Sequence, residues 1–103
     1  MDKKLKVMLV DDHEVVRQGL RSLIESEEDL QVVAEASNGK QAVDAAKAAS
    51  PDVVVMDIRM PEGDGVTACR EIRDMNPEIQ VIMLTSFSGF MSRISLHAVK
   101  SET

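Results

Sequence analysis

The sequence predicts an α/β protein built on one doubly wound parallel sheet. Short apolar runs alternate with segments of helical spacing, and each strand–helix unit takes about 20–25 residues, which suits tight βα crossovers. The run at 52–58 is apolar on both faces, as in a central strand that is covered by helices on each side. Because crossovers of this kind are right-handed, the strands are expected to be parallel. The 103 residues contain no linker or low-complexity segment, so a single domain is expected.

The first strand and the first helix are expected within residues 5–25. The run at 5–10 is apolar and stops at two aspartates, and Asp12 is expected to cap the helix that follows. In that helix the apolar residues recur at helical spacing, while arginines and a glutamate occupy the other face. The apolar stripe consists of Val16, Leu20, Leu23 and Ile24.

The rest of the chain repeats the same alternation. Asn38 is expected to cap the second helix, and Pro51 and Pro77 follow the second and third helices and end them. A loop is expected at 60–65 because of its proline and glycines. The expected strands after the first are 31–36, 52–58 and 80–85, and the expected helices are 40–49 and 66–75.

Composition argues against several classes of protein. The 18 acidic and 12 basic residues give a formal net charge of −6, whereas nucleic-acid binding requires a basic surface. No stretch approaches the roughly 18–20 apolar residues of a membrane span. Cys69 is the only cysteine, so no internal disulfide forms and a cytoplasmic location is expected. We therefore expect no direct nucleic-acid binding and no membrane insertion by this chain.

Three aspartates fall where parallel sheets bind ligands, at the carboxyl ends of the strands. Asp11 and Asp12 end the first strand and Asp57 ends the third, and these strands are neighbours in a sheet of order 2-1-3-4. Carboxylates so placed repel one another unless they share a cation, and a partly wet site with oxygen ligands favours Mg²⁺. Thr85, at the end of the fourth strand, is expected to offer a hydroxyl to this pocket. His13 is expected to face solvent because the site is otherwise all oxygen.

A competing motif lies in the expected loop. Gly63, Gly65 and Ala68 match the spacing of a dinucleotide-binding fingerprint, but residues 59–62 separate them from the preceding strand. That fingerprint opens directly from the strand end, so no dinucleotide cofactor is expected. Pro61 and Gly65 are instead expected to shape the loop.

Three segments together resemble the receiver domains of bacterial two-component response regulators. They are Val10-Asp11-Asp12, the run Met56-Asp57-Ile58-Arg59-Met60-Pro61-Glu62-Gly63-Asp64-Gly65, and Met83-Leu84-Thr85-Ser86. The resemblance covers residues 5 to about 87 and implies a flavodoxin-like receiver fold. Val10-Asp11-Asp12-His13 and Gly19-Leu20 look most like receivers attached to a LuxR/FixJ-type DNA-binding domain, which implies that the whole protein is a transcriptional regulator.

The resemblance implies roles residue by residue. Asp57 matches the phosphoacceptor, which takes phosphate from a sensor histidine kinase, and such a domain is a regulatory phosphoacceptor rather than an enzyme. Asp12 and Asp57 match the direct Mg²⁺ ligands, the backbone carbonyl of Arg59 matches a third, and Asp11 matches an acid that binds the metal through water. Thr85 matches the switch hydroxyl that moves to the phosphoryl group. For the Arg59 side chain two interpretations stay open, since it either tunes hydrolysis of the acyl phosphate or is a surface counter-charge to the acids.

The C-terminal part departs from the family pattern. Receivers usually end with a fifth strand, whose lysine contacts the phosphoryl group, and a fifth helix; no residue here matches that lysine. We therefore expect a receiver core at 1–87 that lacks the fifth strand and helix, and an atypical tail at 88–103, with the DNA-binding output domain absent. The tail is expected to be helical because its apolar residues recur at helical spacing. These residues are Phe90, Met91, Ile94 and Ala98.

Two functions stay open on this evidence. The first is a phosphoacceptor domain that signals through Asp57. The second is a truncated or degenerate receiver that acts only as a protein–protein interaction or dimerisation module. An unpaired edge on the fourth strand would leave open backbone donors and acceptors, so self-association through that edge is expected.

Overall fold

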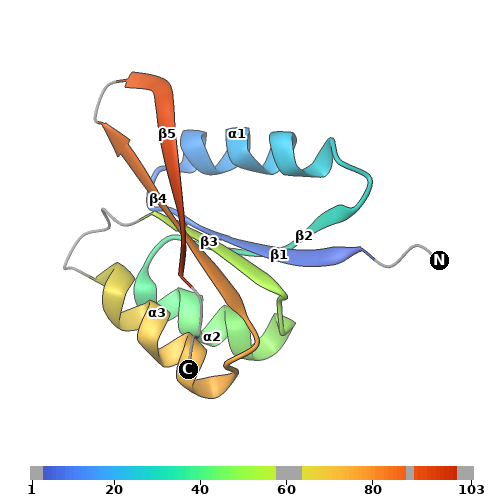
Figure 1. Cartoon of the computed structure of the whole chain (residues 1–103), viewed down its shortest axis with the longest axis vertical. Coiled ribbons are helices and arrows are strands. Elements are labelled where there is room, and N and C mark those ends of the chain that lie inside the picture. The colour runs from blue at the N-terminus through green and yellow to red at the C-terminus, as the bar shows by residue number, and fades with distance from the viewer. Residues whose placement is uncertain (1–3, 58–63, 88–89, 100–103) are drawn as a thin grey trace.

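The computed structural model describes residues 4–57, 64–87 and 90–99 of the chain (Figure 1). Strands and helices alternate three times, and two consecutive strands follow. The strands are β1 (Leu5–Val10), β2 (Leu30–Ala36), β3 (Val53–Asp57), β4 (Gln80–Phe87) and β5 (Phe90–Val99). The helices are α1 (Glu14–Glu25), α2 (Gly39–Ala49) and α3 (Asp64–Met75).

The sheet has the order β2-β1-β3-β4-β5. The first four strands are parallel, so the predicted doubly wound arrangement of order 2-1-3-4 is confirmed. α1 covers one face of the sheet, and α2 and α3 lie on the opposite face (Figure 1). This layering agrees with the apolar pattern of β1, where consecutive residues from Val7 to Val10 are buried and therefore lie on both faces of the sheet. None of the helices in the described parts of the chain is long and apolar enough to cross a bilayer.

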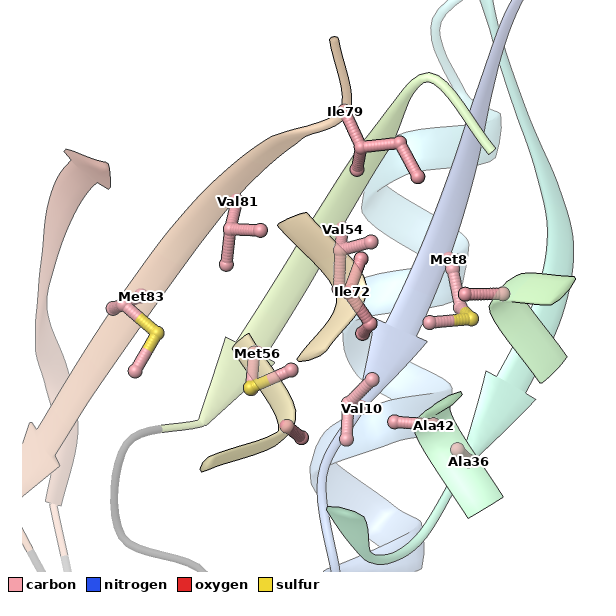
Figure 2. Close-up of a cluster of buried hydrophobic side chains, with 12 residues drawn as sticks. Met8, Val10, Ala36, Ala42, Val54, Met56, Ile72, Ile79, Val81 and Met83 are labelled. Atoms are coloured by element: carbon pink, nitrogen blue, oxygen red, sulfur yellow. The ribbon is translucent and has the colours of Figure 1, made fainter. Parts of the chain in front are cut away.

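The main core lies between the sheet and the α2–α3 layer. Figure 2 shows side chains from β1, β3 and β4 meeting those of the two helices, with Met8 and Met56 fully buried. Ile72 of α3 is also fully buried and lies among these strand residues. The whole cluster comprises Met8, Val10, Ala36, Ala42, Ala46, Val54, Met56, Ala68, Ile72, Ile79, Val81 and Met83.

The face covered by α1 is packed less completely. No residue of α1 is buried, and Leu23, which belongs to the predicted apolar stripe, is 67% exposed. An apolar groove of about 520 Å³ runs between the helix and the sheet. It is lined by Val7, Leu20, Leu23, Ile24, Leu30, Val53, Val55, Ile82 and Leu84. The helix therefore lies against an apolar surface that it covers only in part.

The prediction of a helical tail is wrong. Residues 90–99 form β5, which pairs antiparallel with β4 from Val81↔Val99 to Phe87↔Phe90. Only residues 88 and 89 separate the two strands in the sequence, and such a short connection permits an antiparallel pair but no parallel crossover. Pairing satisfies the backbone groups on the edge of β4, which outweighs the helical spacing of the apolar residues. The edge expected to be bare on the fourth strand is therefore covered.

Two local predictions at helix starts also need correction. α1 begins at Glu14 with His13 as its N-cap residue and no side-chain cap, so Asp12 is not the cap. α3 begins at Asp64, two residues earlier than expected, so Gly65 belongs to the helix and not to the loop. Aspartate is a residue type that is enriched at helix starts, so the sequence is compatible with the earlier start. By contrast the Asn38 cap of α2 is confirmed, since its side chain accepts the N–H of Gln41 at 2.8 Å.

Candidate functional site

The pairing of β1 with β3 brings the predicted acidic residues together. Val10 is the register partner of Met56, so the residues that follow, Asp11 and Asp57, emerge side by side at the carboxyl ends of the two strands. One ligand atom from each of Asp11, Asp12, His13 and Asp57 lies within 4.8 Å of the others. The three carboxylates predicted from the sequence therefore converge, and an imidazole joins them.

Asp11 is buried in this cluster, with 3% of its surface exposed, and Asp57 is similarly buried at 4%. The N–H of Asp11 continues the β1–β2 ladder by donating to the Ala36 carbonyl at 3.0 Å. Its carboxylate Oδ1 accepts the backbone N–H of His13 at 2.8 Å, and the His13 ring Nδ1 lies 3.3 Å from the same oxygen. The Asp11 carboxylate is thus held at a depth where its charge is costly, beside a second buried acid.

The pKa of the Asp11 carboxyl is shifted by opposing effects of burial, His13 and Asp57. Desolvation raises its pKa above the ordinary value of 3.8, the His13 backbone N–H lowers it, and the negative charge of Asp57 raises it again. The net shift is upward. Asp11 is therefore ionised in this pocket only at a cost in free energy, which a bound cation would remove.

Asp12 supplies the clearest sign that the pocket suits a metal. Its side chain is 26% exposed, yet its Oδ1 atom is buried and has no hydrogen-bond partner in the described part of the chain. The His13 Nδ1 lies 3.0 Å from that oxygen, without the geometry of a hydrogen bond. A buried carboxylate oxygen without a donor is costly, and hard oxygen ligands of this type fit Mg²⁺. The residues present therefore fit the expected ion.

His13 is largely exposed, as expected, with 66% of its side-chain surface accessible. Its ring nevertheless lies over both neighbouring carboxylates, which the sequence reading did not anticipate. The repeated acids at 11 and 12 are the signal that could have suggested it, since an adjacent imidazole is within reach of either one.

Behind the acidic cluster, Arg17 of α1 holds the backbone of the β1–α1 connection. Its Nη1 donates to the Asp11 carbonyl at 2.7 Å, and its Nε donates to Glu35 Oε1 at 2.9 Å. Arg21 reaches the other oxygen of Glu35 at 3.0 Å. This group was not predicted from the sequence, although a lone glutamate within the apolar strand run at 31–36 indicates that a cation comes from a neighbouring element.

The other predicted site residues are placed only in part. Thr85 lies on β4, one residue beyond the Leu84 that pairs with Asp57, but β4 continues to Phe87, so Thr85 does not end the strand as expected. The continuation follows from pairing with β5, in which Thr85 is opposite Ser95. Arg59 and Pro61 lie outside the residues that the structure describes.

Comparison with known proteins agrees with this arrangement. Residues 7–99 match the family model described as the response regulator receiver domain. The chain is 47% identical over 83 residues to the response regulator protein VraR of Staphylococcus epidermidis, covering 81% of this chain and 40% of that protein. It is 44% identical over 85 residues to the DNA-binding transcriptional activator DevR/DosR of Mycobacterium tuberculosis, covering 82% of this chain and 39% of that protein. The chain thus spans about 40% of the length of these curated relatives.

Solved structures give the same result for the fold. A LuxR-family two-component response regulator from an Aurantimonas species superposes with a TM-score of 0.77 at 38% identity, over 84% of this chain and 62% of that one. The response regulator domain of Thermotoga maritima CheB gives a TM-score of 0.76 at 36% identity, over 86% and 67%. The predicted flavodoxin-like receiver fold is thereby confirmed. The chain belongs to the response regulator receiver domain family, with homologues among LuxR-family transcriptional regulators.

Proposed function

We propose that this receiver domain is a phosphoacceptor that takes a phosphoryl group on Asp57 with the help of Mg²⁺. The observation that carries the proposal is the convergence of three carboxylates, two of them buried, within 4.8 Å at the end of β1 and β3. A structural role explains poorly why two buried acids should face each other. A reaction that brings in both a cation and a phosphoryl group explains it directly.

Asp12 and Asp57 would hold the ion directly, and Asp11 would hold it through water. The Arg59 carbonyl is a further proposed ligand from a residue outside the described ranges. When bound, Mg²⁺ supplies positive charge that offsets repulsion between the carboxylates and the incoming phosphoryl oxygens. The Oδ1 of Asp12 supports this assignment because it is buried and accepts no hydrogen bond within the described part of the chain.

Asp57 would act as the nucleophile. One of its carboxylate oxygens forms a bond to phosphorus, the bond from phosphorus to the imidazole nitrogen of the donor phosphohistidine breaks, and the imidazole leaves with the bonding electrons. The hydroxyl of Thr85 would then donate a hydrogen bond to a phosphoryl oxygen. This bond would couple phosphorylation to the position of β4. The domain in this account is a regulatory phosphoacceptor that assists its own phosphorylation and dephosphorylation.

The proposed partner is a sensor histidine kinase, as the family implies. DevR/DosR is described as a DNA-binding transcriptional activator, so we propose that this receiver regulates transcription through a separate DNA-binding domain. The net charge of −6 supports assigning DNA contact to such a domain and not to this one. A cytoplasmic location follows from that role.

Self-association is a further part of the proposal. β5 now forms the outer edge of the sheet, and the apolar groove beside α1 is lined by side chains that would gain from being covered. Light scattering after size-exclusion chromatography tests this point. A clean monomer at high micromolar concentration would contradict it.

The experiment for the main proposal compares phosphorylation by acetyl phosphate in Mg²⁺ and in EDTA. We expect modification in Mg²⁺ and a rate lower by about 100-fold in EDTA, because the charge repulsion is then uncompensated. Asp12→Asn should show a similar loss with the fold retained, as judged by circular dichroism. A module that serves only protein–protein interaction would show no modification under either condition.

A further inference from the structure

We propose that Arg17 is a positioning residue that fixes the backbone immediately before Asp12 and so prepares the acidic pocket for its cation. The inference rests on the proposed function, because the pocket matters only if it binds Mg²⁺. It concerns a side chain that lies behind the acids and is not itself a ligand.

The side chain of Arg17 binds the backbone immediately before Asp12. Its Nη1 donates to the carbonyl of Asp11 at 2.7 Å. Its backbone N–H donates to the carbonyl of His13 at 3.0 Å, but this is the ordinary bond of the first helical turn and does not depend on the side chain. Because the guanidinium fixes the peptide group between Asp11 and Asp12, the direction in which Asp12 projects its side chain is restricted.

The guanidinium is itself anchored on β2. Its Nε donates to Glu35 Oε1 at 2.9 Å, in a pair of which only 18% and 26% of the side-chain surfaces are exposed. The next residue, Ala36, accepts the N–H of Asp11 at 3.0 Å. The N–H of Asp11 is thus bound by Ala36, and its carbonyl is bound by Arg17, which is anchored on Glu35. Both anchoring residues are consecutive in β2. Charge-assisted bonds in a partly buried setting favour a single geometry.

Only an arginine satisfies both partners. Nε and Nη1 are different atoms of one planar fork, and they serve Glu35 and the Asp11 carbonyl at the same time. A lysine would keep the positive charge but would present one nitrogen for two separate acceptors. We therefore expect the Mg²⁺ affinity to depend on the geometry of the guanidinium as well as on its charge.

Arg21 provides a matched control. It lies one turn further along α1, and it donates to Glu35 Oε2 at 3.0 Å. It is 52% exposed, and within the described part of the chain its side chain contacts Glu35 and Glu25 and not the β1–α1 connection. Replacing Arg21 by alanine removes the same charge and a bond to the same carboxylate while leaving the bond from the Arg17 side chain to the Asp11 carbonyl in place.

The test compares Arg17→Ala, Arg17→Lys and Arg21→Ala in two measurements. The first is the Mg²⁺ dissociation constant by calorimetry. We expect an increase of about 10-fold for Arg17→Ala, the scale on which groups that orient metal ligands act. Arg17→Lys should stay about three-fold weaker than the wild type because it keeps charge but not the fork. Arg21→Ala should lie close to the wild type.

The second measurement is hydrogen exchange, in the metal-free protein, of the backbone amides of Asp11 and His13, which donate to the Ala36 carbonyl and to Asp11 Oδ1. We expect exchange about 10-fold faster in Arg17→Ala and unchanged in Arg21→Ala, because only the former releases the connection. If Arg17→Ala fails to fold, Arg17→Lys carries both measurements. Equal exchange and equal Mg²⁺ affinity in the Arg17 variants and the wild type would overturn the inference, and so would equal losses in the Arg17 and Arg21 variants.

The two proposals fail in distinguishable ways. A wild-type protein that does not bind Mg²⁺ would contradict the proposed function. The exchange arm is measured without metal, so it would still decide whether Arg17 orders the connection. Wild-type Mg²⁺ binding together with unaltered Arg17 variants would contradict the positioning role alone.

Discussion

His13 contacts Asp11 twice, through a backbone N–H that lies 2.8 Å from Asp11 Oδ1 and through a ring nitrogen 3.3 Å from the same oxygen. The backbone contact orients a buried carboxylate at the point where β1 ends and α1 begins. The ring contact is made by a side chain that is 66% exposed. The pocket therefore depends more on the backbone contact than on the ring contact.

The first prediction separates them. In His13→Ala the backbone N–H is kept, so we expect a change in the free energy of unfolding within about 0.5 kcal/mol, as for other exposed positions. The Mg²⁺ dissociation constant should change by less than about three-fold, because Mg²⁺ prefers oxygen ligands. Urea unfolding and calorimetry measure the two quantities. A loss of Mg²⁺ affinity beyond 10-fold, on the order of a lost ligand or orienting group, would make the imidazole part of the site.

The second prediction concerns the charge of Asp11. Burial raises its pKa above 3.8, so the folded protein holds this proton to higher pH than the unfolded chain. The contribution of Asp11 to stability is therefore most favourable below 3.8 and is lost as the pH rises through the folded-state pKa. In EDTA at pH 7 we expect Asp11→Asn to be more stable than the wild type, because the amide carries no charge that burial disfavours.

Urea unfolding of the wild type and Asp11→Asn across pH 4–7 measures this effect in the metal-free state. The advantage of the variant should grow with pH and shrink when Mg²⁺ is added, because the cation stabilises the ionised wild-type pocket. A variant that is less stable than the wild type in EDTA at pH 7 would show that ionised Asp11 is stabilised by the protein alone.

The third prediction contrasts the two faces of the sheet. Ile72 of α3 is fully buried, so Ile72→Ala should cost about 2–5 kcal/mol of unfolding free energy. Leu23 of α1 is 67% exposed, so Leu23→Ala should cost less than about 0.5 kcal/mol in dilute protein. Denaturant midpoints at matched concentrations provide the comparison. A large loss in Leu23→Ala would mean that the groove beside α1 is covered in solution.

The fourth prediction tests the β4–β5 pair. Leu96 is the register partner of Leu84, and a proline inside a strand fixes φ and removes an N–H. Leu96→Pro should therefore speed hydrogen exchange of β4 amides while β1 and β3 keep their protection. Leu96→Val is the matched control, since it keeps the N–H and a good strand residue. Unaltered protection of β4 in Leu96→Pro would show that the edge is not held by β5.

How far the sequence predicts this molecule depends on the range of the interactions. The convergence of Asp11 and Asp57 was predictable because each follows an apolar run, and parallel neighbouring strands place their carboxyl ends at one edge. Asn38 was predictable because its cap is local. Asp12 was misassigned as a cap because an aspartate before a helix can serve either the helix or a ligand site, and local pattern does not separate the two roles.

Interactions between distant residues could not be read in the same way. Arg17 and Glu35 are 18 residues apart, and each alone fits an exposed surface position. The tail at 90–99 has apolar residues at helical spacing, but its partner is the open edge of β4, and edge pairing depends on tertiary context. Because of the same pairing, β4 continues beyond Thr85 to Phe87, so the predicted strand end at Thr85 is wrong.

The central claim is that the carboxylate of Asp57 accepts the phosphoryl group, and site localisation tests it most directly. The protein is treated with acetyl phosphate and Mg²⁺, its intact mass is measured, and borohydride then reduces any aspartyl phosphate to homoserine for peptide mapping. We predict a gain of about 80 Da, homoserine at position 57, and no gain in Asp57→Asn. No gain in the folded wild type, or a gain that survives Asp57→Asn, would contradict the account.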